Sequence, residues 1–373
     1  MRLARIVSRM NKSAAAFAAP GPKAAIVDRL ADLPGPFDNP GQLGTRCYVP
    51  AKLKSPAALI VVLHGCTQDA ATYDHGSGWS RLADRHGFAL LYPEQRRSNN
   101  FNLCFNWYQP GDAARGAGEP ASIRAMIARM AELHPIDPAR IFVTGLSAGG
   151  AMASVMLATY PETFAGGAII AGLPYGVAGN LHEAFETMAG RGIADDKALT
   201  AAVTAASPHA GPWPRISVWH GTADNLVVRG NADAIVRQWQ GVHGLRRAPD
   251  VADRVDGYPH RVWHGADGAA LIEEYEITGM AHGTPLAPGR GAGRSGKAGA
   301  HMLDVAISST DRIAAFFGIA KAAAPAAKRV AAKAEAAATK HAAPRRKPAK
   351  APPAHATVQT IIEDALRSAG LMR

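Results

Sequence analysis

Short apolar runs alternate with longer amphipathic stretches along the middle of the chain. The runs carry almost no polar side chains, which is typical of strands that helices cover on both faces. We expect such strands at Ala58–Leu63, Phe88–Tyr92, Ile141–Thr144, Gly167–Ala171 and Ile216–Trp219. The spacing of apolar residues between or after them predicts helices at Ser122–Leu133, Ala148–Tyr160, Ala232–Gln240 and Leu303–Phe317.

Strands that alternate with helices indicate a parallel sheet joined by right-handed crossovers. The expected fold class is therefore α/β, with a mostly parallel central sheet and helices on both faces. Leu271–Thr278 alternates more between apolar and polar residues and suits a strand near an edge of that sheet. Pro174–Pro214 has little strand signal and is either an insertion over a site or a set of helices between two strands, whereas Pro285–Ala300 is a glycine-rich loop.

Changes in composition divide the chain into four segments. Residues 1–43 have a mixed pattern and are interpreted as an N-terminal arm, and residues 44–320 hold the alternating strands and helices. Residues 321–357 are rich in Lys, Ala and Pro with few large apolar side chains, so we expect a disordered linker there. Residues 358–373 have the pattern of a short terminal helix.

The positive charge is concentrated in the C-terminal segment. The chain has a formal charge of +11, and residues 321–373 hold 11 Lys or Arg against 3 Asp or Glu, a net charge of +8. The first 320 residues carry the remaining +3, so the basic balance says little about what they bind. We expect weak electrostatic attachment of this tail to an anionic surface or a nucleic acid, with a merely solvating tail as the alternative.

Cysteine content and the length of apolar runs exclude several classes of protein. The three cysteines include no C-x-x-C pair, so they predict neither a disulfide framework nor a cysteine zinc cluster. No stretch approaches the roughly 20 apolar residues of a membrane span. Residues 1–20 lack the Leu-, Ile- or Val-rich core of a signal peptide. These features predict a soluble protein and slightly favour the cytoplasm.

The strongest chemical signal is the pentapeptide GLSAG at residues 145–149. It matches G-x-S-x-G, follows a predicted strand and opens a predicted helix, which is the context of a nucleophile elbow. Small neighbours expose the serine hydroxyl on a sharp turn, and the helix N-terminus stabilises developing negative charge. We therefore expect Ser147 to be the nucleophile of an α/β-hydrolase fold, and an ordinary glycine turn is the alternative.

A serine nucleophile needs a histidine base and an acid that orients the base, and in this fold the acid precedes the histidine in sequence. His282 follows the last predicted strand among glycines that permit a tight loop, so we expect it to be the base, with His301 as the weaker rival. Asp224 follows a buried strand at its carboxyl end, where catalytic groups collect in open α/β sheets. Asp267 stands in a similar sequence but precedes a strand, so Asp224 is the expected acid.

Two backbone N–H donors should stabilise the oxyanion. One is the N–H of Ala148, and the other is the N–H of Cys66, which Gly65 exposes in the loop after Ala58–Leu63. Cys66 is a poor nucleophile candidate because no elbow surrounds it. Cys66 and Cys104 either lie close enough for a disulfide that braces the site or remain two separate buried thiols.

A cluster of aromatic residues follows this loop in the sequence. Its members are Phe101, Phe105, Trp107 and Tyr108, which either line an apolar substrate groove or pack in the core. We take Trp107 and Tyr108 as candidate substrate contacts, together with Thr67 beside the oxyanion loop.

Seven stretches between residues 44 and 318 are similar to the poly(3-hydroxybutyrate) depolymerase family of esterases, a relative of the feruloyl and acetylxylan esterases. They are LHGCTQ (63–68), RLADRHGFALLYPEQ (81–95), CFNWY (104–108), GEPASI (118–123), IDPARIFVTGLSAGGAMASVMLATYPETFA (136–165), VWHGTADNLV (218–227) and GMAHGTP (279–285).

The resemblance implies hydrolysis of short hydroxyacyl or acyl esters by an α/β-hydrolase that uses no metal and no organic cofactor. By matching motifs, it implies Ser147, Asp224 and His282 as the triad and Cys66 in the oxyanion hole. Family members are often secreted and can carry a substrate-binding domain, whereas this chain has a Lys/Ala/Pro extension.

The expected function is a serine esterase that acts on oligomeric or polymeric 3-hydroxybutyrate-like esters. One alternative is a feruloyl- or acetylxylan-type carboxylesterase. The other is a protein that binds polymer granules or nucleic acid and keeps an inactive hydrolase body.

Overall fold

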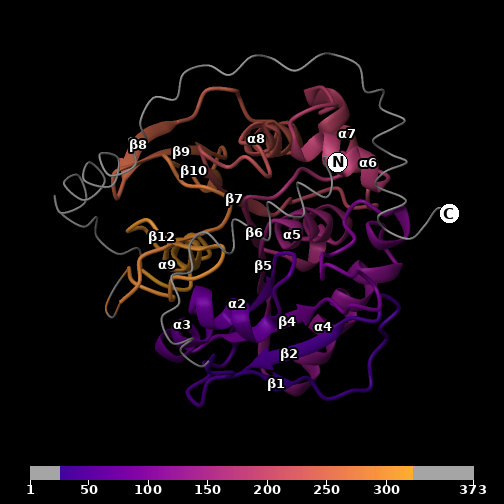
Figure 1. Ribbon diagram of the computed structural model, residues 1–373, viewed down its shortest axis with the longest axis vertical. Coiled ribbons are helices and arrows are strands. Elements are labelled where there is room, and N and C mark those ends of the chain that lie inside the picture. Colours follow the sequence, from indigo (N-terminus) through magenta and orange to yellow (C-terminus); the bar gives the residue numbers. More distant parts are fainter. Residues whose placement is uncertain (1–25, 290, 292, 322–373) are drawn as a thin grey trace, which may run out of the picture. The chain divides into compact units, whose positions relative to one another are not determined.

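A ten-stranded sheet forms the centre of the protein (Figure 1). The computed structural model describes residues 26–321, apart from residues 290 and 292. The strand order is β1-β2-β4-β3-β5-β6-β7-β10-β9-β8. All strands from β4 across to β10 run parallel, and the strands beyond them on either side pair antiparallel. The strands of this sheet are β1 (Ala31–Asp32), β2 (Gly44–Tyr48), β3 (Ala57–Leu63), β4 (Ala89–Glu94), β5 (Ile136–Leu146), β6 (Gly166–Ile170), β7 (Arg215–Gly221), β8 (Val251–Val255), β9 (Tyr258–His264) and β10 (Ala270–Ile277).

Helices cover both faces of this sheet and bury its alternating side chains. Val61 and Leu63 of β3 belong to one hydrophobic cluster, with residues of α4, α5 and α8, whereas Ile60 and Val62 belong to another, with residues of α2, α3 and α9. Each fully buried Val, Leu or Ile stabilises the fold by about 1.5–3 kcal/mol. The helices are α2 (Ala70–Ser77), α3 (Trp79–His86), α4 (Gly118–Leu133), α5 (Ala148–Thr159), α6 (Leu181–Met188), α7 (Asp196–Ala205), α8 (Gly230–His243) and α9 (Ser309–Phe316), with the 3-10 turns η1 (Pro110–Asp112) and η2 (Pro161–Thr163).

The predicted fold class is confirmed, since the five apolar runs form β3 to β7 in a mostly parallel sheet with helices on both faces. Pro174–Pro214 holds α6 and α7 between β6 and β7, which is one of the two arrangements that its weak strand signal allowed. Side-chain caps define both helix starts, because Asn180 and Asp195 accept the N–H groups of Glu183 and Ala198.

Two predictions for the C-terminal half are wrong. The helix expected at Leu303–Phe317 begins only at Ser309, where the Ser308 side chain caps it. The residues at the start of the expected helix instead belong to β12 (Met302–Asp304), which pairs with β11 (Thr284–Leu286). The strand expected near an edge is β10, which has β9 and β8 outside it. β8 and β9 form a hairpin that turns at Asp256-Gly257, and both residues have positive φ. An Asp-Gly pair favours such a turn, but the search for apolar runs does not take it into account.

Residues 26–43 pack against the sheet, although their sequence pattern placed them in an arm. β1 pairs with β2, Leu30 and Leu33 are buried, and Arg29 donates hydrogen bonds to Tyr48 and Asp84. The predicted linker at residues 321–357 lies outside the described residues except for Lys321, and the predicted helix at 358–373 lies wholly outside them. Within residues 26–321, leaving aside 290 and 292, no helix has the length and apolar character to cross a membrane, and no group of three or more metal-binding side chains is found.

Candidate active site

Ser147 occupies a sharp turn between β5 and α5, at the carboxyl edge of the sheet. Its backbone has φ 58° and ψ −118°, a conformation that non-glycine residues rarely adopt and that stores about 1–3 kcal/mol of strain. The Ser147 N–H donates to the Ile170 carbonyl of β6 at 2.9 Å, which ties the turn to the neighbouring strand. A strained serine between a strand and a helix has the geometry of a nucleophile elbow.

Glycines make this turn sterically possible. A Cβ atom on Gly145 would lie 2.2 Å from the Gly149 carbonyl oxygen, and a Cβ atom on Gly149 would lie 2.4 Å from the Leu63 carbonyl oxygen. Both distances are far below van der Waals contact, so the start of α5 packs backbone against backbone on the end of β3. The loop that follows β3 therefore begins next to the elbow.

Asp224 and His282 meet at the same edge of the sheet. Asp224 lies shortly after β7 and His282 shortly after β10, and His282 Nδ1 is 2.7 Å from Asp224 Oδ2. β5, β6, β7 and β10 are consecutive parallel neighbours. Their carboxyl ends therefore bring Ser147 to the same edge as the Asp224–His282 pair.

Several N–H groups surround the Asp224 carboxylate. The N–H groups of Leu226 and Val227 donate to Oδ1 at 2.9 and 3.0 Å, and His220 Nε2 lies 3.5 Å from Oδ2. Burial raises the pKa of Asp224, but the facing His282 and His220 outweigh burial, so the pKa lies well below its usual range. An acid that stays ionised can orient a histidine and stabilise it when it is protonated. His220 lies in the VWHGTAD segment, in which only the aspartate has a predicted catalytic role.

His301, the rival base, lies directly against His282. Its Nδ1 is 3.2 Å from the His282 carbonyl oxygen, and the two rings lie 5.9 Å apart in an edge-to-face arrangement. Burial lowers the pKa of His301, which favours a neutral ring. Asp224 hydrogen-bonds His282, so His282 has the carboxylate partner that a triad base requires.

Asp267, the rival acid, lies at the other end of the strands. It stands in the turn between β9 and β10, where its Oδ1 accepts the Ala269 N–H at 3.0 Å. Because β7 and β10 are parallel, the turn before β10 and the loop after β7 lie at opposite edges of the sheet. Asp224 and Asp267 are therefore separated by the length of a strand.

The loop after β3 carries the expected second oxyanion donor. The neighbouring amides are occupied, because Gly65 N–H donates to Gln68 Oε1 and Thr67 N–H donates to the Asn102 carbonyl. Among the described residues, no backbone acceptor outside the regular elements is found for the N–H of Cys66 or of Ala148. Cys66 and Cys104 form a disulfide, which confirms the bonded alternative, while Cys47 is a buried free thiol.

Replacing both Cys66 and Cys104 with alanine is expected to lower the free energy of unfolding by about 3–4 kcal/mol. The disulfide links residues 38 positions apart, and its loss restores conformational entropy to the unfolded chain. Urea unfolding of the double variant measures this loss. Cys47→Ala is the control, since it removes a thiol without removing a cross-link. Equal losses in the two variants would contradict a contribution from the cross-link.

Glu119 on α4 is a buried carboxyl group that connects to this loop through Gln95. Gln95 Nε2 donates to Glu119 Oε1 at 2.5 Å and to the Cys104 carbonyl at 3.1 Å, and Asn106 N–H donates to Glu119 Oε2 at 2.9 Å. Burial, with a further contribution from Asp112, raises the pKa of Glu119 to about 8. At neutral pH the native protein therefore holds this carboxyl mainly in its protonated form.

Glu119→Gln is expected to remove a pH dependence of stability between pH 5 and pH 8. In that range the native Glu119 keeps a proton that the unfolded chain has released, so the free energy of unfolding falls as pH rises, by about 1 kcal/mol per pH unit. Urea unfolding at pH 5, 6.5 and 8 should give a flatter profile for Glu119→Gln than for the wild type. The exposed Glu132 provides the control change to glutamine. Identical profiles for the wild type and Glu119→Gln would contradict the prediction.

The candidate substrate contacts differ in exposure. Thr67 is exposed and has a positive φ of 63°. Tyr108 is half-buried and meets Trp107 edge to face at 5.6 Å, and Trp107 is nearly buried in the core. Of the other two aromatic residues, Phe105 is fully buried and Phe101 is 79% exposed. The cluster therefore divides between core packing and the surface.

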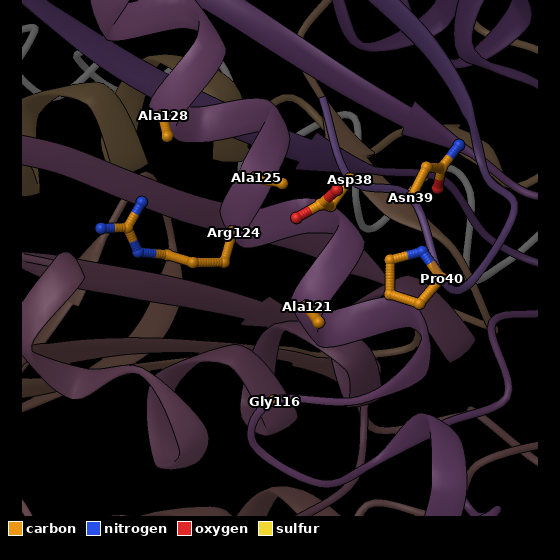
Figure 2. A pocket seen from close by; sticks show the side chains of 8 residues that line it. All are labelled: Asp38, Asn39, Pro40, Gly116, Ala121, Arg124, Ala125 and Ala128. Carbon is orange, nitrogen blue, oxygen red and sulfur yellow. The ribbon is translucent and has the colours of Figure 1, made fainter. Parts of the chain in front are cut away.

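A surface hollow of about 500 Å³ lies between α4 and the segment before β2 (Figure 2). Figure 2 shows alanines along one face of α4 with Asp38 and Pro40 across from them. The lining residues are Asp38, Asn39, Pro40, Gly116, Ala121, Arg124, Ala125 and Ala128. None of these belongs to the predicted site. A smaller polar cavity of about 200 Å³ adjoins Asn106 and Glu119.

A parallel sheet with a serine elbow at its carboxyl edge defines the α/β-hydrolase class, and the matching family and the relatives described below are carboxylic ester hydrolases. The chain belongs to the esterase PHB depolymerase family, whose model matches residues 46–257.

Three relatives illustrate the range of this similarity. The chain is 48% identical over 285 residues to poly(3-hydroxyalkanoate) depolymerase C of Paucimonas lemoignei, covering 75% of this chain and 68% of the relative. It is 33% identical over 257 residues to a probable acetylxylan esterase A of Aspergillus clavatus, covering 67% and 82%. The solved acetyl xylan esterase from Aspergillus awamori superposes with a TM-score of 0.63 at 25% identity, covering 76% of this chain and 96% of that one. The predicted esterase activity and family are confirmed.

Proposed function

We propose that this esterase hydrolyses oligomers or polymers of 3-hydroxybutyrate-like hydroxy acids through an acyl-enzyme on Ser147. The main support for the site is the 2.7 Å hydrogen bond between His282 Nδ1 and Asp224 Oδ2, at the sheet edge that carries the strained serine. The identity of 48% to a poly(3-hydroxyalkanoate) depolymerase supports the substrate class.

Ser147, His282 and Asp224 each have one role in the proposed reaction. The Nδ1–H group of His282 donates a hydrogen bond to Asp224. Nε2 is therefore free to take the Ser147 Oγ proton as that oxygen attacks the ester carbonyl carbon. The N–H groups of Ala148 and Cys66 stabilise the oxyanion. His282 passes the proton to the leaving alcohol, and a water molecule then releases the acid from Ser147 by the reverse proton transfers.

The proposed substrate contacts lie near the oxyanion loop in sequence or in space. Thr67 follows Cys66 directly and is exposed, so its hydroxyl is available to an ester group bound there. Trp107 and Tyr108 follow Cys104, the disulfide partner of Cys66. The half-buried Tyr108 ring offers an apolar surface to a hydroxyacyl chain, and the buried Trp107 ring packs edge to face against it. This assignment extends the proposed triad and depends on it.

A feruloyl- or acetylxylan-type carboxylesterase is the second candidate. Its support is the 33% identity to a probable acetylxylan esterase A and the structural similarity to an acetyl xylan esterase. Both candidates use the same triad, so they differ only in the acyl and alcohol groups that the site accepts.

Hydrolysis rates on a trimer of 3-hydroxybutyrate, methyl ferulate and acetylated xylan separate these candidates. We expect the trimer to have the highest kcat/KM by about tenfold or more, because a pocket shaped for one acyl group discriminates by that much. Turnover of p-nitrophenyl butyrate serves as the control for intact protein. A preference for methyl ferulate or acetylated xylan would favour the second candidate. Folded protein that hydrolyses none of the esters would contradict both candidates.

The electrostatic attachment expected for the basic tail stays a prediction. Residues 322–373 lie outside the described part of the chain, and the relatives reported above give no support for nucleic-acid binding. An ester substrate is therefore the partner that the family supports.

A further inference from the structure

The Gly65–Cys66 peptide group controls where the Cys66 N–H points. In a planar trans peptide the C=O of one residue and the N–H of the next point in opposite directions. The Gly65 carbonyl accepts hydrogen bonds from His64 Nδ1 at 2.8 Å and from Gln68 N–H at 3.3 Å. These donors hold the carbonyl on one side and therefore aim the Cys66 N–H to the other side.

His64 has the protonation state that this arrangement needs. Its Nε2 accepts the Gln95 N–H at 3.1 Å, so in the neutral ring the proton must lie on Nδ1, which faces the Gly65 carbonyl. The side chain is 1% exposed, and burial lowers the pKa of His64 to about 4. The ring therefore stays neutral and donates to Gly65 throughout the neutral pH range.

Gln95 holds this histidine and the far end of the disulfide together. Its backbone N–H binds His64, and its side-chain amide binds both the Cys104 carbonyl and Glu119. These residues come from four separate stretches of the sequence, LHGCTQ, RLADRHGFALLYPEQ, CFNWY and GEPASI. No residue of the proposed triad lies in these four stretches, whereas a single hydrogen-bond network connects them.

We propose that His64 is a positioning residue for ester hydrolysis, which orients the Cys66 N–H toward the oxyanion by holding the Gly65 carbonyl. Gln95 and Glu119 hold the imidazole and the disulfide in fixed positions relative to each other. This role rests on the proposed function, in which the Cys66 amide is an oxyanion donor. It adds a residue that touches neither the substrate nor the triad.

Two amide variants of His64 separate its two hydrogen bonds. His64→Asn places an N–H donor at the position of Nδ1, and His64→Gln places an acceptor at the position of Nε2, so each variant keeps one bond and loses the other. His64→Gln should lower kcat on p-nitrophenyl butyrate about 100-fold with KM within about threefold, since a lost oxyanion donor affects the transition state. His64→Asn should keep kcat within about fivefold of the wild type, because it restores the donor to Gly65.

His243→Gln is the control for loss of a half-buried imidazole outside the site. Burial also lowers the pKa of His243 to about 4, and its Nε2 is hydrogen-bonded to the Pro214 carbonyl, away from the oxyanion loop. The His243→Gln variant should have a lower free energy of unfolding and an unchanged kcat. Equal kcat values for His64→Gln and His64→Asn would overturn the proposal, because a structural role alone does not distinguish donor from acceptor.

Ser147→Ala separates failure of this inference from failure of the proposed function. If Ser147→Ala is inactive and His64→Gln keeps wild-type kcat, only the role of His64 is overturned. If Ser147→Ala remains active, the proposed function itself fails. Should His64→Gln not fold, Gln95→Met decides, since it removes the amide that joins Cys104 to Glu119 and leaves the backbone N–H in place. We expect its kcat to fall about tenfold with KM unchanged, and an unchanged kcat would overturn the proposal.

Discussion

Ser147→Ala is expected to lower kcat/KM for p-nitrophenyl butyrate by about 10⁴-fold or more, because loss of the nucleophile removes the covalent route. The fold should persist. Alanine and serine are strained alike at φ 58°, and alanine fits where the larger side chain already fits. Steady-state hydrolysis and thermal unfolding of the same protein sample measure both effects.

Ser154→Ala is the matched control, on the helix that follows Ser147. Ser154 is buried, and its Oγ donates to the Leu173 carbonyl at 2.7 Å rather than facing the sheet edge. This variant should lose about 1 kcal/mol of stability with little change in turnover. Substantial activity in Ser147→Ala with unchanged stability would rule out Ser147 as the nucleophile.

Asp224→Asn is expected to lower kcat by about 10³- to 10⁴-fold, whereas Asp267→Asn should leave it nearly unchanged. Asparagine at position 224 can donate a hydrogen bond to His282 Nδ1, so the proton of the neutral ring moves from Nδ1 to Nε2. Nε2 then cannot accept the Ser147 proton. Asp267 lies in the turn before β10, at the opposite edge of the sheet. Parallel kinetics of the two variants on one ester measure the difference.

Stability measurements complete that comparison. Asp224 is buried among N–H donors, so Asp224→Asn should also lower the unfolding temperature, and the kinetics must be taken below that temperature. Equal activities in the two variants, or the larger loss in Asp267→Asn, would contradict the assignment of the acid.

The apolar runs predicted the centre of the sheet well because hydrophobic burial alone specifies strands covered on both faces. ALIVVL became β3, and ISVW became part of β7. The outer hairpin was missed because most of its side chains are only partly buried, so its pattern lacks an apolar run. The start of α9 was misplaced because the pairing of β12 with β11 competes with the local helical pattern, and sequence spacing does not reveal that pairing.

The residues of the proposed triad were predictable because each follows a predicted strand. The loops after parallel strands lie at the same edge of the sheet, so such residues are expected near one another. The supporting groups were not. His64 and His220 each precede a glycine in one of the motifs. The role of His64 depends on Gln95, which comes from another segment. His220 faces Asp224 of its own segment, and residue spacing alone does not show that the two side chains meet. Hydrogen bonds between distant segments arise only from the tertiary fold.

Covalent labelling tests the central assignment most directly. The wild-type protein is incubated with diethyl p-nitrophenyl phosphate, which reacts with activated serines, and the modified peptide is identified by mass spectrometry. The proposed triad predicts one diethylphosphoryl group on Ser147, loss of esterase activity in proportion to labelling, and no labelling of Asp224→Asn on the same time scale. Labelling of another serine in proportion to inactivation, or full inactivation with Ser147 unmodified, would contradict the assignment of Ser147 as the nucleophile.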